Sequence, residues 1–92
     1  MDLQDLRHKI DNIDDELIRL FEERLGVAAD IARYKQQHGL PVFDPAREKQ
    51  KLCDISSKVN EKNKEDISNF FTLLFKISRA RQEEILNTRG VI

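Results

Sequence analysis

The sequence predicts an all-α protein, and three observations lead to that fold class. Apolar residues recur at alternating spacings of three and four along residues 3–34, which is the repeat of an amphipathic helix. Two later segments also have helical periodicity, and typical capping residues mark where helices begin and end. No segment alternates between apolar and polar residues as a strand does. Within 92 residues, we expect one domain covering 1–92, folded as a three-helix protomer with one long and two shorter helices.

The first helix is expected to begin at Leu3 and to run for about 35 residues. Asp2 is suited to the N-cap position, and Gly39 followed by Pro41 should end the helix. Its apolar seam has one charged member, Arg24; the other members are Leu3, Leu6, Ile10, Ile13, Leu17, Leu20, Val27, Ile31 and Tyr34. A seam of this length has to be buried against another surface.

This first helix is too long for a domain of its size. At about 1.5 Å per residue it would span roughly 50 Å, whereas a compact domain of this length measures about 30 Å across. About 20 Å of apolar seam would then extend into water. Because a two-fold symmetric pair buries such a surface, we expect an intertwined homodimer.

The second helix is expected to begin in the segment FDPAREKQ. Asp44 can serve as its N-cap and Pro45 as its first residue, since proline is favoured at that position. Glu48 lies at the start of the apolar line of this helix, which continues through Leu52, Ile55 and Val59. An acid near a helix N-terminus is favoured by the helix dipole.

A third helix is expected over about residues 65–87, after a polar connection formed by residues 60–66. Its apolar residues are Ile67, Phe70, Phe71, Leu74, Phe75, Ile85 and Leu86. Ser78 and Gln82 interrupt this line one helical turn apart, so they could form a hydrogen bond to each other or to a backbone carbonyl.

The composition argues against several classes of protein. Charged residues make up 36% of the chain and the net charge is −1, so the basic excess of nucleic-acid or membrane-surface proteins is missing. The sequence has no apolar run of about 18 residues and no signal-peptide pattern, so we expect a cytoplasmic location. Cys53 cannot form an internal disulfide and is expected to be a small buried residue. His8 and His38 lie far apart without cysteine partners, so we predict neither a metal site nor a cofactor.

Polar side chains occupy positions where apolar ones are expected. Arg24 and Lys35 lie at the two ends of one line on the first helix, roughly 16 Å apart at about 1.5 Å per residue. Glu48 occupies such a position on the second helix, and Ser78 and Gln82 do so on the third. Taken alone, each has a structural explanation, such as fixing the register of a helix pair or complementing a helix dipole.

Taken together, these residues favour a ligand. A buried charge costs several kcal/mol unless it is paired, and cations outnumber the single acid on these faces. A small molecule with about two carboxylates, held between the helices, would supply the missing charge. No nucleophile with an adjacent base is evident, so the site is suited to binding and electrostatic stabilisation.

Three segments resemble the all-helical (AroQ-type) chorismate mutases: LRHKIDNIDDELIRLFEERLGVAADIARYK, PVFDPARE and FFTLLFKISRARQ. The resemblance covers the chain from about Leu3 to Glu84. It implies three-helix protomers in an intertwined homodimer, with two sites that each draw residues from both subunits. It also implies an isomerase that rearranges chorismate to prephenate in phenylalanine and tyrosine biosynthesis, without a cofactor.

The resemblance implies a role for each polar residue. Arg7 would reach the partner's site and bind a substrate carboxylate, and Arg24 would bind a carboxylate in its own subunit. Lys35 and Gln82 would donate to the ether oxygen of chorismate. Glu48 would accept a hydrogen bond from the ring hydroxyl. Of these, Lys35, Gln82, Arg24 and Glu48 are the implied catalytic residues.

Three further residues complete the implied substrate-binding set. Asp44 would contribute near the ring hydroxyl through its backbone, Arg47 would face a carboxylate, and Ser78 would lie near a carboxylate. Because the reaction is an intramolecular pericyclic shift, catalysis needs a compact substrate conformer and donors aimed at the ether oxygen.

Two other functions remain open. An isochorismate pyruvate-lyase on the same fold would share the arginines and Lys35, although an apolar residue tends to replace the acid at Glu48 in that subfamily. A non-catalytic helical dimerisation or regulatory module is the second alternative, and the presence of all eight polar residues argues against it. The chain could be a free-standing enzyme or a domain of a fusion protein.

Overall fold

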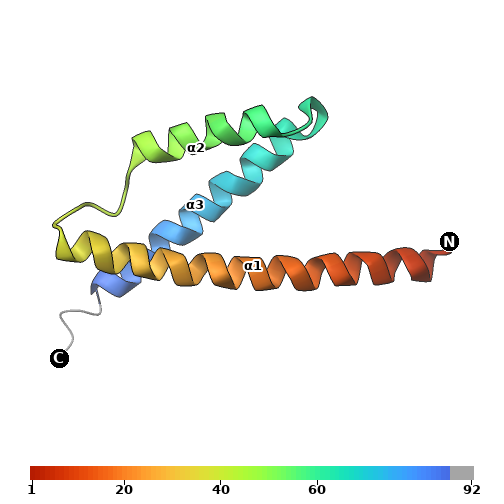
Figure 1. The fold of residues 1–92 in the computed structure, drawn as a ribbon, viewed down its shortest axis with the longest axis horizontal. Coiled ribbons are helices and arrows are strands. Elements are labelled where there is room, and N and C mark those ends of the chain that lie inside the picture. The colour runs from red at the N-terminus through yellow and green to blue at the C-terminus, as the bar shows by residue number, and fades with distance from the viewer. Residues whose placement is uncertain (88–92) are drawn as a thin grey trace.

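The computed structural model describes residues 1–87, which form three α-helices and a short 3₁₀-helix and contain no strand. The last five residues of the expected domain, 88–92, lie outside the described residues. The helices are α1 (Leu3–Gln37), α2 (Pro45–Lys58), η1 (Glu61–Asn63) and α3 (Lys64–Asn87). In Figure 1, α1 runs the length of the molecule, α3 crosses its C-terminal half, and α2 and α3 diverge from the turn at η1. The predicted all-α class is confirmed for the described residues.

The boundaries of α1 follow from local capping. The Asp2 side chain accepts from the backbone N–H of Asp5 at 2.9 Å, and the Asp5 side chain accepts from the backbone N–H of Asp2 at 3.3 Å. This reciprocal pair is a capping box. At the other end, Gly39 has φ +65°, a left-handed conformation that suits glycine. The predicted start, N-cap and 35-residue length of α1 are confirmed.

The start of α2 also agrees with the prediction, and α3, which was expected over about residues 65–87, begins at Lys64 and ends at Asn87. The Asp44 side chain accepts from the backbone N–H of Arg47 at 3.1 Å, with Pro45 as the first helical residue. The expected connection over residues 60–66 is wrong in part, because it contains η1 and the start of α3. Asn60 caps η1 by accepting from the backbone N–H of Lys62 at 3.0 Å. The glutamates and lysines of the connection are good helix formers, so η1 and the first turn of α3 form within this polar stretch.

The core of the described chain is thin. α3 packs against both α1 and α2, whereas the described α1 and α2 do not approach each other closely. The buried apolar residues are Ala28, Ala32, Val42, Ile55, Leu74 and Phe75, and no large side chain among the described residues is fully buried. Two of the six are alanines on α1, which contribute little apolar area. The space between α1 and α2, backed by α3, is where polar side chains gather.

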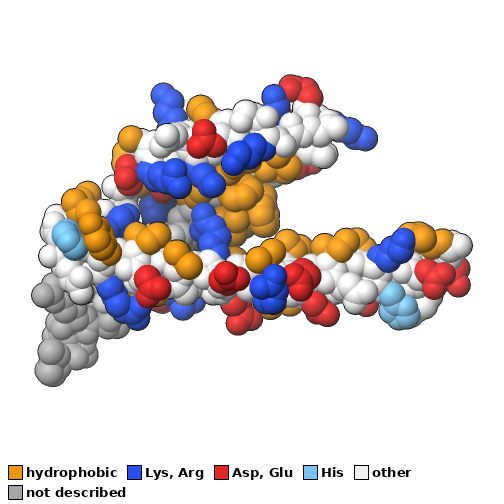
Figure 2. Space-filling view, viewed as in Figure 1, with side chains coloured by type: hydrophobic (Ala, Val, Ile, Leu, Met, Phe, Trp, Pro, Cys, Tyr) orange, Lys and Arg blue, Asp and Glu red, His pale blue; other side chains and the backbone are white. Residues whose placement is uncertain are grey.

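The N-terminal half of α1 extends beyond the other helices. The described residues measure 56 × 31 × 14 Å, and the longest dimension follows α1 (Figure 1). The seam residues of this half remain exposed: Leu3, Leu6, Ile10, Ile13, Leu17 and Leu20. In Figure 2 they form an apolar strip along one edge of the helix. The expected overhang of α1 is therefore present in the described chain.

Cys53 is exposed, so the expectation that it would be buried is wrong. Its neighbour Ile55 is the buried residue of α2. Side chains two positions apart on a helix point in directions that differ by about 200°, so Cys53 and Ile55 lie on nearly opposite faces of α2. The described residues also include no helix that is both long and apolar enough to cross a membrane.

Candidate active site

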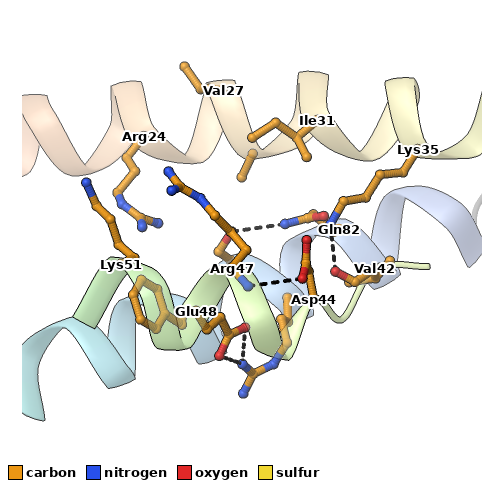
Figure 3. A pocket seen from close by; sticks show the side chains of 14 residues that line it. Arg24, Val27, Ile31, Lys35, Val42, Asp44, Arg47, Glu48, Lys51 and Gln82 are labelled. Atoms are coloured by element: carbon orange, nitrogen blue, oxygen red, sulfur yellow. Dashed lines mark hydrogen bonds and ion pairs between the residues drawn. The ribbon is translucent and has the colours of Figure 1, made fainter. Parts of the chain in front are cut away.

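A pocket of about 520 Å³ lies between α1, α2 and α3 (Figure 3). It is lined by seven of the eight polar residues that the family resemblance implies: Arg24, Lys35, Asp44, Arg47, Glu48, Ser78 and Gln82. These residues come from three helices and from the loop before α2. The fold therefore brings together side chains that are up to 58 positions apart in the sequence, from Arg24 to Gln82.

Helix α1 supplies the two cations at opposite ends of the pocket wall (Figure 3). The guanidinium carbon of Arg24 lies 5.9 Å from the ring centroid of Phe75. The Nζ atom of Lys35 donates to the backbone carbonyl of Val42 at 2.7 Å. Between the two cations, the small, buried Ala28 also lines the pocket. Arg24 and Lys35 are therefore held in place by contacts with other elements.

The first turn of α2 faces the same pocket. Asp44 caps this helix through its side chain, and its backbone carbonyl accepts from the N–H of Glu48 at 3.1 Å. The cap fixes the start of α2, so Arg47 and Glu48 in its first turn take defined positions. Figure 3 shows both side chains at the pocket together with Asp44.

Helix α3 contributes an amide that is almost fully buried. Gln82 has only 6% of its surface exposed. Its Nε2 atom donates to the hydroxyl oxygen of Ser78 at 3.1 Å, as the spacing of one helical turn allowed. Its Oε1 atom is buried and has no hydrogen-bond partner. A buried amide with an unsatisfied atom is costly unless a ligand or a rearrangement satisfies it.

Two cations at the pocket were not predicted from the sequence. Arg79 binds the carboxylate of Glu48, and its guanidinium carbon lies 5.0 Å from the ring centroid of Phe43. Lys51 also lines the pocket. It follows Arg47 by four positions, so helical periodicity could have placed it on the same face. Nothing in the local sequence pairs Arg79 with Glu48.

The pocket lining carries an excess of positive charge. Its cations are Arg24, Lys35, Arg47, Lys51 and Arg79, and its acids are Asp44 and Glu48. Five cations against two acids leave three positive charges unbalanced by the lining itself. Four of these cations are partly buried and Arg47 is exposed, so the excess charge attracts an anionic ligand into the pocket.

Arg7 does not line this pocket. It precedes Arg24 by 17 positions on α1, or about 25 Å at about 1.5 Å per residue. Its side chain is exposed on the overhanging half of the helix. Within the described chain, the structure therefore separates Arg7 from the other seven residues.

Comparison with known proteins gives the family of this chain. The family described as Chorismate mutase type II matches residues 6–83. The chorismate mutase of Methanocaldococcus jannaschii is 37% identical over 86 residues, which cover 91% of this chain and 87% of that protein. The T-protein of Haemophilus influenzae is 50% identical over 46 residues, which cover 50% of this chain but only 12% of that longer protein.

A solved structure agrees with these relatives. The crystal structure of chorismate mutase from Helicobacter pylori in complex with prephenate superposes with a TM-score of 0.83 at 40% sequence identity. The match covers 92% of this chain and 93% of that one. The family match, the relatives and the shared fold lead to one conclusion: this chain belongs to the type II chorismate mutase family.

Proposed function

We propose that this chain, as a chorismate mutase, binds chorismate in the pocket between α1, α2 and α3 and rearranges it to prephenate there. The observation that carries this assignment is the pocket lining, in which five cations and two acids surround a space of about 520 Å³. Chorismate is a small dianion, so the charge excess suits it. No covalent intermediate is needed, because one C–O bond breaks as one C–C bond forms within the same molecule.

The two cations of α1 stabilise different charges on the substrate. Arg24 at one end of the wall binds a carboxylate, which is charged before and during the reaction. Lys35 at the other end donates to the ether oxygen, where negative charge grows as the C–O bond breaks. Lys35 already donates to the Val42 carbonyl at 2.7 Å. An ammonium has three donors, so this bond orients the group and leaves others for the substrate.

Gln82 supplies the second donor to the ether oxygen. In the described structure its amide nitrogen is bound to Ser78 and its amide oxygen lacks a partner. Rotation of the amide by about 180° would let the Ser78 hydroxyl donate to Oε1 and turn the N–H groups toward the pocket. This rotation gives the buried Oε1 atom a hydrogen-bond partner and also directs an N–H donor at the ether oxygen.

The remaining residues hold the compact substrate conformer. Arg47 and Ser78 lie near the carboxylates, while Asp44 and Glu48 lie near the ring hydroxyl. Restricting the substrate to a reactive geometry lowers the entropic part of the barrier. Glu48 also favours the mutase over an isochorismate pyruvate-lyase, since its carboxylate is suited to accept from the hydroxyl of chorismate.

The complete site requires a second copy of the chain. We infer an intertwined homodimer in which Arg7 from the overhanging half of one α1 enters the pocket of the other protomer. The exposed seam of α1 supports this assembly, since a second chain would bury its apolar residues. A second hollow between α2 and α3, lined by Ile55, Val59, Ile67, Phe70 and Phe71, offers apolar surface of matching chemistry. A cytoplasmic location stays a prediction from the sequence.

The direct test is an assay on the purified 92-residue chain. Chorismate should disappear and prephenate should appear in equal amounts, without added metal or cofactor. Formation of pyruvate from isochorismate, with no turnover of chorismate, would instead assign the lyase. Turnover of neither substrate by a folded dimer would favour the non-catalytic module. Sedimentation of the same sample should show a dimer, and a folded, active monomer would contradict the shared site.

A further inference from the structure

Glu48 has a charged partner within the protein. One nitrogen of the Arg79 guanidinium, Nη1, donates to both carboxylate oxygens of Glu48. Among the described residues, this is the only ion pair whose members lie more than four positions apart in the sequence. It joins α2 to α3 and is drawn with dashed lines in Figure 3. The pair fixes Glu48 relative to the helix that also carries Ser78 and Gln82.

Arg79 is itself held from a second side. Its guanidinium carbon lies 5.0 Å from the ring centroid of Phe43, within the range of a cation–π contact. Phe43 directly precedes Asp44, the N-cap of α2. Only 33% of the Arg79 side chain and 24% of the Glu48 side chain are exposed, so both charges are partly withdrawn from water. The guanidinium between a ring and a carboxylate therefore has little freedom, and it restricts Glu48 in turn.

This pairing changes what Glu48 can bind. A carboxylate has about four acceptor sites, and the Arg79 nitrogen uses one on each oxygen. The remaining sites can accept from a neutral hydroxyl group. The negative charge, however, is already balanced by the guanidinium. A cationic donor would therefore gain little attraction from Glu48, while the other cations of the lining would repel it.

We propose that Arg79 is a positioning and specificity residue, which holds Glu48 as an acceptor for a neutral ring hydroxyl and disfavours an ammonium group at that place. The proposal rests on the proposed function, in which Glu48 meets the ring hydroxyl of chorismate. Arg79 acts through Glu48 and does not contact the reacting atoms. The discrimination is between two substrates of the same shape, in which a hydroxyl is replaced by an amine that is protonated at neutral pH.

The test compares chorismate with its ring-amino analogue. For each variant, kcat/KM is measured on both substrates, and the amine-to-hydroxyl ratio is the readout. Arg79→Met leaves Glu48 with an unbalanced charge, so the ratio should rise at least about tenfold. General damage to the fold would lower both rates together and leave the ratio unchanged. Arg79→Lys keeps the positive charge, so its ratio should stay nearer the parent value than that of Arg79→Met.

Arg81→Met is the matched control. Arg81 lies on the same helix, its Nε is 3.6 Å from the carboxylate of Glu84, and it does not line the pocket. Both rates and their ratio should match those of the parent. A change in ratio as large as that of Arg79→Met would show a general effect of lost charge and would overturn the proposal.

A double-mutant cycle tests whether Arg79 acts through Glu48. In a Glu48→Gln background, Arg79→Met should change the ratio by less than about twofold, because the residue it positions is gone. A ratio that stays unchanged in Arg79→Met alone, or that changes fully in the Glu48→Gln background, would overturn the proposal. Circular dichroism checks folding, and Arg79→Gln, which also removes the charge, carries the same test if Arg79→Met does not fold. Failure of the parent chain to convert chorismate would count against the proposed function instead.

Discussion

Replacing Lys35 with alanine should slow the chemical step far more than it weakens substrate binding. Lys35 is the charged donor that we assign to the ether oxygen, and it is oriented by the Val42 carbonyl at 2.7 Å. Removing one preorganised donor to a developing oxyanion costs about 2.7–4 kcal/mol, or roughly 10²–10³ in kcat. A charged donor should reach at least that range, so we expect kcat to fall at least about 100-fold.

The effect on stability should be small by comparison. A hydrogen bond from a charged group contributes about 1.5–3 kcal/mol, and water can replace part of it because Lys35 is only half-buried. A net loss of about 1 kcal/mol would lower the Tm by about 4–8 °C in a domain of this size. Lys35 lies in the last turn of α1, so the overhanging half of the helix and its dimer contacts should persist.

The assay is steady-state kinetics on chorismate, with Arg33→Ala as the control. Arg33 lies two positions earlier on α1, pairs with the exposed Asp30 at 3.1 Å and does not line the pocket, so its loss should leave kcat and KM unchanged. Lys35→Arg should rescue only part of the rate, because the planar guanidinium presents its donors differently. If Lys35→Ala raises KM and leaves kcat near the parent value, Lys35 is a carboxylate anchor and the electrostatic reasoning fails.

Two other predictions concern the remaining donors and the shared site. Gln82→Glu should be active at acidic pH and lose activity as pH rises, because a glutamate donates a hydrogen bond only while it is protonated. Burial should raise the pKa of this glutamate above the usual value of about 4.3. Equal rates at pH values of about 5 and 8 would show that Gln82 does not donate to the ether oxygen. Mixing inactive Arg7→Ala and Lys35→Ala chains should restore some activity, since each hybrid dimer contains one site with neither substitution. Absence of recovery, after subunit exchange has been demonstrated, would exclude Arg7 from the partner's site.

The helix boundaries were predictable because the signals that set them are local. Asp2 caps α1 with Asp5, and Asp44 caps α2 beside Pro45, within three residues in each case. The start of α3 was predicted to within one residue, but the short helix η1 in the polar connection before it was missed. Polarity alone did not distinguish a solvated connection from the first turn of a helix.

The pocket was predictable in part, for a related reason. Helical spacing placed Arg24 and Lys35 on one line and Ser78 within reach of Gln82, and these relations lie within one helix. The partner of Glu48 lies 31 positions away on another helix, so it depends on how α2 and α3 pack. Charge counting set Glu48 against Arg24 and Lys35, whereas the structure pairs it with Arg79.

The thin core described above has a consequence at low protein concentration. The described residues include six that are apolar and buried, two of them alanines, and such a core is too small to stabilise a lone chain. Folding of the inferred dimer should then be coupled to association, so its stability depends on the protein concentration. Each tenfold dilution should lower the free energy that favours the folded pair by about 1.4 kcal/mol. Specific activity should therefore fall as the enzyme is diluted toward its dissociation constant, and added chorismate should delay that fall by binding only the assembled state.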